Sequence, residues 1–205
     1  MKTPEGKVVA LGFQGVGKTS IICRYINKTL SERSHPTIGA CYHTCYLTVE
    51  NTRIVLKVWD TAGQEKFRSM APMYYRSANA AMLVFDLTQY DTFTAMKEWV
   101  TELHKHVENS IVLVVIGNKS DLEEKRQVDA AEGRAYATEI GAGYHETSVV
   151  QNEGIEDVFL DIAKGLVRLL PTECDQDLDA YGETPRNVDV VHELCETSER
   201  SRKCC

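Results

Sequence analysis

The chain has no run of apolar residues approaching the roughly 20 needed to cross a bilayer, and no apolar segment of the signal-peptide type near residue 1. It also lacks an excess of positive charge, because 23 Lys and Arg face 30 Asp and Glu, for a net charge of −7. With no basic stripe, the composition argues against nucleic acid as the main partner. These absences predict a protein that is made and kept in the cytosol.

Cysteine pairs with the spacing of a zinc site are absent as well. The seven cysteines are scattered, and in a reducing compartment the first three are expected to act as small apolar residues. Cys204 and Cys205 stand apart, because they are adjacent and end the printed chain.

The hydrophobic content of 43% can build one packed core of about 170 residues, so we expect one domain over residues 1–170. Composition changes at Pro171. Residues 171–205 hold nine acidic and four basic residues, few apolar ones and no periodicity. This composition predicts a disordered acidic tail.

Short apolar runs alternate with stretches of helical periodicity. The expected strands are residues 7–11, 42–49, 53–60, 80–86, 111–116 and 143–146, with a hairpin turn at residues 50–52. The expected helices are residues 19–26, 92–107, 130–140 and 155–170, and residues 67–76 are a helix or a loop. The alternation predicts an α/β fold: a single domain with a mostly parallel six-stranded sheet, one strand antiparallel, helices on both faces and ligands at the carboxyl ends of the strands.

Residues 12–19, GFQGVGKT, fit the phosphate-binding pattern G-x-x-x-x-G-K-[ST] at every fixed position, between an expected strand and an expected helix. The glycines allow backbone N–H groups and the helix N-terminus to face phosphate oxygens. Lys18 is expected to reach the β and γ phosphates, and the Thr19 hydroxyl to bind Mg²⁺. Asp60, at the end of a strand beside the loop, is placed to hold the same ion through water.

A second motif, GNKSD at residues 117–121, directly follows a buried strand. Asp121 can accept hydrogen bonds from the N1–H and the exocyclic amine of guanine, Asn118 can orient the loop, and the Lys119 stem can cover the ring. Alone, this motif could be a plain surface turn. Its position after GxxxxGKT and DxxGQ, with Glu146-Thr147-Ser148 following, favours guanine.

Over residues 7–170 the chain resembles the Ras superfamily of small GTPases, and within it the Rab family. The resemblance rests on Ile38-Gly39-Ala40, on Trp59 with DTAGQE at residues 60–65, on Phe67-Arg68-Ser69, Tyr74-Tyr75-Arg76 and LVFDLT at residues 83–88, and on Cys204-Cys205. Residues 37–40 and 71–76 are similar to the early-endosomal branch.

The resemblance implies a P-loop GTPase domain that binds GTP or GDP with Mg²⁺. Gln64 would be the catalytic residue that orients the attacking water, Thr37 would close over Mg²⁺ and the γ-phosphate, and the Gly63 N–H would bind that phosphate. The implied nucleotide-binding residues are Gly15, Val16, Gly17, Lys18, Thr19, Ser20, Thr37, Gly63, Asn118, Lys119, Asp121, Ser148 and Val149, and the implied metal residues are Thr19, Thr37 and Asp60.

Tyr42, Trp59 and Tyr74 match the aromatic triad through which Rabs meet effectors, with plain sheet packing as the alternative for each ring. Cys204 and Cys205 resemble a double geranylgeranylation site. The implied location is therefore the cytoplasmic face of endosomal or other endomembranes, with a cytosolic pool. The implied partners are an exchange factor, a GTPase-activating protein, a GDP dissociation inhibitor or escort protein, and effectors.

The resemblance implies a GTP-hydrolysing switch of vesicle or endosomal traffic that recruits effectors in the GTP state. No arginine is placed as an internal finger, so we expect slow intrinsic hydrolysis and an acceleration of roughly 10³- to 10⁵-fold by the activating protein. A nucleotide-bound scaffold with negligible turnover stays open. A small-molecule kinase with a P-loop has no reason to carry the GNKSD motif.

Three positions depart from the family pattern. Leu30 stands where an aromatic residue usually stacks on guanine, and Val149-Val150 replace the usual Ala-Lys. Both changes predict weaker nucleotide retention, although the Val149 N–H can still meet the guanine oxygen. Gln14 stands where small residues are usual, close to the expected γ-phosphate, and predicts impaired hydrolysis.

Overall fold

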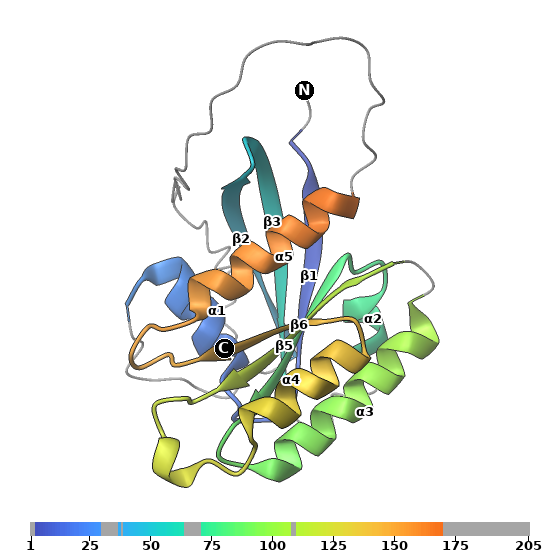
Figure 1. The fold of residues 1–205 in the computed structure, drawn as a ribbon. Helices are drawn as coiled ribbons and strands as arrows, with labels where there is room; N and C mark the ends of the chain where they lie inside the picture. The colour runs from blue at the N-terminus through green and yellow to red at the C-terminus, as the bar shows by residue number, and fades with distance from the viewer. Residues whose placement is uncertain (1–2, 30–36, 38, 64–70, 108–109, 170–205) are drawn as a thin grey trace, which may run out of the picture.

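The computed structural model describes residues 3–29, 37, 39–63, 71–107 and 110–169. Within these residues the strands form one six-stranded sheet in the order β2-β3-β1-β4-β5-β6 (Figure 1). The strands are β1 Glu5–Leu11, β2 Ala40–Val49, β3 Thr52–Thr61, β4 Ala80–Asp86, β5 Val112–Asn118 and β6 Gly143–Thr147. Strand β2 is antiparallel to β3, and the other neighbouring pairs are parallel. The predicted sheet is confirmed.

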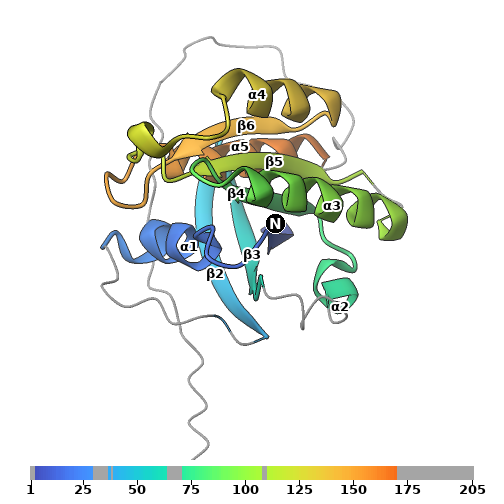
Figure 2. The ribbon, with the colours of Figure 1, turned by 90° about the horizontal axis from the view of Figure 1, so that it is seen from below.

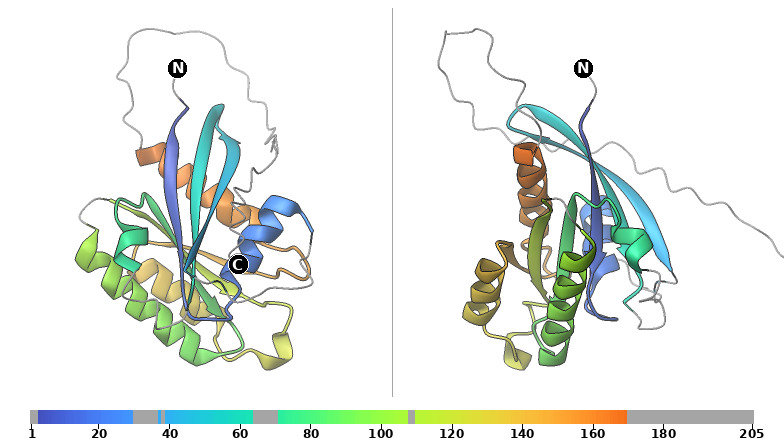
Figure 3. Two further views of the ribbon diagram at one scale, coloured as in Figure 1. Left: turned by 180° about the vertical axis from the view of Figure 1, so that it is seen from behind. Right: turned by 90° about the vertical axis from the view of Figure 1, so that its right-hand side faces the viewer.

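Helices cover both faces of this sheet (Figure 3). They are α1 Lys18–Asn27, α2 Ala71–Tyr75, α3 Tyr90–His106, α4 Ala130–Glu139 and α5 Ile155–Leu169, with a short 3-10 helix, η2, at Glu123–Lys125. Successive side chains of a strand point to opposite faces, so β1 supplies both cores. Val8 and Ala10 pack with residues of α1 and α5, whereas Val9 and Leu11 pack with residues of α2, α3 and α4.

Some element bounds differ from the sequence-based prediction. The hairpin turn between β2 and β3 has two residues instead of three, Glu50 and Asn51, and both have positive φ, of 49° and 62°. Such a turn matches the twist of the strands it joins, so Thr52 already pairs with Val49. Strand β5 continues to Asn118, because the polar start of the GNKSD motif still pairs with β4 and β6.

The carboxyl ends of the parallel strands lie at one edge of the sheet, which Figure 2 views from below. The register places Ala10 opposite Asp60, Asp86 opposite Asn118, and Asn118 opposite Thr147. The fold therefore brings the phosphate loop and the GNKSD motif, about a hundred residues apart in the chain, to the same edge.

Candidate functional site

The phosphate loop joins the end of β1 to the start of α1. Gly17 caps the helix with φ 101°, a left-handed conformation, and a Cβ added there would come 2.2 Å from Asn118 Nδ2. Only glycine fits both the backbone conformation and this close approach. The first turn of α1 has no acidic residue, and its cap makes no side-chain hydrogen bond. The helix N-terminus is thus left open to an anion from outside the chain.

Lys18 lies buried under this loop. Only 5% of the residue is exposed, and its ammonium Nζ donates to the carbonyl oxygens of Gly12 and Phe13, both at 2.9 Å. Burial lowers the pKa of Lys18 to about 8, against the opposing charge of Asp60. Gly63 lies directly against the same group, because a Cβ there would come 2.5 Å from the Lys18 Nζ. The lysine and Gly63 therefore meet at the point where the family resemblance places the γ-phosphate.

Three oxygen-bearing side chains from separate segments meet beside the lysine. The Thr19 hydroxyl donates to Asp60 Oδ2 at 2.6 Å, and the Thr37 hydroxyl lies 2.8 Å from that of Thr19. Asp60 is fully buried, and its second oxygen, Oδ1, has no hydrogen-bond partner among the described residues. Burial raises the pKa of Asp60, and the hydroxyl of Thr19 and the charge of Lys18 oppose that rise.

Hydroxyl and carboxylate oxygens are the donors that Mg²⁺ prefers in proteins. A buried carboxylate oxygen without a partner, beside two threonine hydroxyls, therefore fits such an ion. The structure brings together the three predicted metal residues, Thr19, Thr37 and Asp60.

The motif residues near the predicted base site are linked to one another and to the phosphate loop. The side-chain amide of Asn118 donates to the Val16 carbonyl at 2.8 Å and accepts from the Thr147 hydroxyl at 3.0 Å. The buried Ser148 hydroxyl donates to Asp121 Oδ1 at 2.6 Å, which orients that carboxylate. Val149 follows Ser148 and packs against the core, whereas Val150 is 63% exposed.

Two charged groups of this region were given no role at the site by the sequence, so sequence reasoning missed both. Asp86, the last residue of β4, is 1% exposed and forms an ion pair with Lys119, with Nζ and Oδ2 2.6 Å apart. Arg126 forms a two-pronged contact with Glu146, at 2.9 and 2.7 Å. The available signal for Asp86 was a carboxylate at the end of an otherwise apolar strand. Arg126 gave no such signal, because one more charged residue in a polar stretch predicts only a solvated surface.

The three predicted effector aromatics lie side by side. The rings of Tyr42 and Trp59 meet edge to face with centroids 5.4 Å apart, and Trp59 and Tyr74 are 6.1 Å apart. Tyr42 is 48% exposed, whereas Trp59 and Tyr74 are partly buried and pack against the core on the α3 face. Trp59 and Tyr74 therefore pack against the core, while Tyr42 presents an exposed ring at the surface of the cluster.

The remaining predicted site residues divide into two groups. Gly15 is exposed in the phosphate loop, Ser20 lies in the first turn of α1, and Gln14 is exposed on the loop. Gln64, Leu30, Cys204 and Cys205 lie outside the described residues, as does the predicted tail.

The site and the fold define the class of protein: an α/β nucleotide-binding domain with a phosphate loop between β1 and α1. A family model described as the Ras family matches residues 7–168. The Ras-related protein Rab-21 of Rattus norvegicus is 38% identical over 204 residues, 97% of this chain and 91% of that protein.

The Ras-related protein RabJ of Dictyostelium discoideum is 47% identical over 163 residues, 80% of this chain and 64% of the relative, so the chain spans just under two thirds of that protein. The Ras-related protein Rab5 of Nicotiana tabacum is 42% identical over 169 residues, 82% of this chain and 84% of the relative. The chain belongs to the Ras family, in its Rab group, and is a small GTPase that binds GTP and GDP. In the described part of the chain, no helix is long and apolar enough to span a membrane.

Proposed function

We propose that this GTPase is a molecular switch of vesicle traffic that acts on endosomal membranes and recruits effectors in its GTP state. One observation carries the proposal: Lys18, the oxygen cluster around Asp60, and the chain of contacts from Asn118 to the phosphate loop lie at one edge of the sheet. The traffic and endosomal parts of the proposal come from the resemblance to the Rab family, which the Rab relatives support.

The phosphates bind in the loop over residues 15–20. The N–H groups at the start of α1 face the phosphate oxygens, and the ammonium of Lys18 exchanges its two carbonyl contacts for contacts with the β and γ phosphates. Thr19, Thr37 and Asp60 would hold Mg²⁺. When bound, the ion supplies positive charge against the phosphate oxygens.

The guanine base binds against the motifs at the ends of β5 and β6. Asp121 accepts from the N1–H and the amine of the base, in an orientation held by the Ser148 hydroxyl. The N–H of Val149 meets the guanine oxygen, and the Lys119 stem covers the ring. A hydrogen-bonding site of this kind discriminates strongly against adenine, because a mismatched base leaves buried polar groups unpaired.

Hydrolysis and switching depend on the segments next to Thr37 and Gly63. Gln64 orients the attacking water, and an activating protein supplies the missing arginine. Loss of the γ-phosphate removes the ligand of both Thr37 and the Gly63 N–H, so the flanking segments relax. The aromatic cluster of Tyr42, Trp59 and Tyr74 borders these segments, which favours effector binding in the GTP state.

Two lipid chains on Cys204 and Cys205 anchor the protein, because one chain gives only marginal membrane binding and two give stable binding. The acidic tail acts as a spacer, since its charge is repelled by an anionic leaflet. An exchange factor and a GDP dissociation inhibitor or escort protein complete the cycle. Membrane recruitment that survives replacement of both cysteines by serine would contradict the lipid anchor.

The test is release of labelled GDP and GTP from the full chain, together with single-turnover GTP hydrolysis, each with Mg²⁺ and with the ion chelated. The proposal expects binding of guanine over adenine nucleotides, faster release without Mg²⁺, and slow turnover that requires Mg²⁺. Tight binding with no turnover would favour the alternative, a nucleotide-bound scaffold. No binding of guanine nucleotides would overturn the proposed function.

A further inference from the structure

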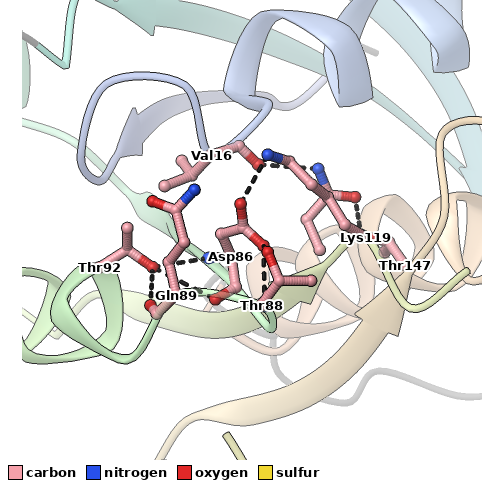
Figure 4. Close-up of polar contacts among 8 residues, drawn as sticks. Val16, Asp86, Thr88, Gln89, Thr92, Lys119 and Thr147 are labelled. Atoms are coloured by element: carbon pink, nitrogen blue, oxygen red, sulfur yellow. Dashed lines mark hydrogen bonds and ion pairs between the residues drawn. The ribbon is translucent and has the colours of Figure 1, made fainter. Parts of the chain in front are cut away.

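We propose that Asp86 is a positioning residue for the guanine base, because its buried charge holds the ammonium of Lys119 and so fixes the lysine stem over the ring. The inference rests on the proposed guanine site. Asp86 ends β4 whereas Lys119 directly follows β5, and the motifs read from the sequence gave Asp86 no role at the base site (Figure 4).

The carboxylate of Asp86 is held in one orientation. Its Oδ1 accepts two hydrogen bonds from Thr88, one from the backbone N–H at 2.9 Å and one from the hydroxyl at 2.7 Å. The backbone N–H of Asp86 itself donates to the Thr92 hydroxyl at 2.9 Å. With the backbone and one oxygen fixed, the other oxygen, Oδ2, has one direction in which to point.

That direction is toward Lys119. Oδ2 makes no hydrogen bond among the described residues, and the Lys119 Nζ, 2.6 Å away, is its ion-pair partner within this part of the chain. A carboxylate that is 1% exposed needs a compensating charge, because an unpaired buried charge is strongly destabilising. The lysine side chain, by contrast, is 33% exposed. The ammonium is therefore directed inward to Asp86, while part of the stem stays accessible.

The backbone at Lys119 supports the same geometry. Its φ is +69°, a left-handed conformation that a lysine rarely adopts, and it lies between Asn118, which is tied to the phosphate loop, and Asp121, the predicted base acceptor. A flexible four-carbon stem pinned at both ends has few conformations left to lose when a ligand packs on it. The pinned stem is thus preorganised for the base.

This chain depends on that stem more than a typical member of its family would. Leu30 and Val150 stand in place of the aromatic residue and the lysine that would otherwise contact the base, and Val150 is 63% exposed. With those two contacts reduced, the Lys119 stem carries a larger share of base retention.

The test is a double-mutant cycle on release of labelled GDP from the full chain, using Asp86→Asn, Lys119→Met and the double variant. Asparagine keeps the shape and the acceptor oxygen for Thr88, and methionine keeps an unbranched apolar stem without the charge. Glu156→Gln is the matched control, because it removes an exposed ion pair, with Lys28, in which no residue of the GNKSD motif takes part. Thermal unfolding of each GDP-loaded protein is measured alongside.

We expect Asp86→Asn and Lys119→Met each to accelerate GDP release by about tenfold, and the double variant to release GDP little faster than either single one. Glu156→Gln should leave release within about twofold of the wild type. Multiplying effects in the double variant, or an unchanged release rate in Asp86→Asn, would overturn the inference. If Asp86→Asn does not fold, Thr88→Val takes its place in the test, because it removes a hydroxyl that orients the Asp86 carboxylate. GDP release should then be severalfold faster, and an unchanged release rate would overturn the inference. If the wild type does not retain guanine nucleotide, the proposed function itself fails.

Discussion

The side-chain amide of Asn118 donates to the backbone carbonyl of Val16 over 2.8 Å, and this one contact joins the two motifs of the site. The oxygen of the same amide accepts from Thr147. Asn118 thus acts as a structural bridge between the phosphate loop and the ends of β5 and β6, in addition to any contact with a ligand.

Replacing this bridge should loosen the site. Asn118→Ala removes two buried hydrogen bonds and leaves the Val16 carbonyl without its partner, at a cost of about 1 to 3 kcal/mol. We expect GDP release to be at least about tenfold faster, measured with a fluorescent nucleotide. Asn79→Ala is the control, because it removes one exposed hydrogen bond, from the Lys7 N–H. Equal effects of the two variants would contradict the bridging role.

Gly17 can be tested against a glycine in a similar backbone conformation. Gly17 has φ 101° and a Cβ there would clash with Asn118, whereas Gly141 has φ 68° and open space around the Cβ position. Alanine is strained in the left-handed backbone conformation of both positions, so both variants should unfold at a lower temperature. Only Gly17→Ala should also lose nucleotide affinity. Equilibrium titration with labelled GDP separates the two effects, and normal affinity in Gly17→Ala would refute the prediction.

The exposed Val150 offers a gain-of-function test. If the missing lysine weakens retention, Val150→Lys should slow GDP release severalfold, since a lysine stem could pack beside the base. The control is Leu169→Lys, which makes the same apolar-to-lysine change at a residue 48% exposed at the end of α5. A release rate that stays at the wild-type value in Val150→Lys would show that this departure from the family pattern has no consequence.

Gln14 is exposed on the phosphate loop, and its backbone nitrogen lies 2.6 Å from a Cβ added at Gly63. A bulky side chain here stands near the expected γ-phosphate, where it can crowd the attacking water or an incoming arginine. Gln14→Ser should therefore raise the single-turnover hydrolysis rate, basal or stimulated, without changing GDP release. No gain in either rate would contradict the prediction.

The contact of Glu146 with Arg126 predicts a dependence on pH. Hydrogen bonds from Arg126 lower the pKa of Glu146 below its ordinary value of 4.5. The stabilisation, about 1 kcal/mol for a partly exposed pair, is present above that value and is lost as the pH falls through the lowered pKa. Glu146→Gln should be less stable than wild type at pH 7, and the difference should shrink below pH 4.5. Urea unfolding at a series of pH values measures it, and a difference independent of pH would exclude the charge as the cause.

Residues with fixed spacing in a motif could be predicted from the sequence. Lys18 and Thr19 follow from the loop pattern, and the alternation of strands and helices gave the sheet with its single antiparallel strand. Spacing alone could not predict which side chains from separate segments touch, and the meeting of Thr19, Thr37 and Asp60 was expected only from the family resemblance. Spacing along the chain carries no information on the 2.8 Å approach of Thr37 to Thr19. Asp86 was missed for a related reason, since its importance depends on Lys119, which follows a different strand, β5.

The position of β1 has a consequence for how the domain folds. Strand β1 pairs with β3 from Val55 onward on one side and with β4 from Ala80 onward on the other, so the strand that starts the chain is completed only by partners far along it. Contacts of such high sequence separation slow folding, because a long loop must close before they form. In a nascent chain that ends before β4, the phosphate loop is present, but β1, which leads into the loop, lacks its β4 neighbour. The nucleotide site is therefore complete only after β4 and the later strands have paired, and bound nucleotide at saturating concentration then opposes unfolding of the whole domain.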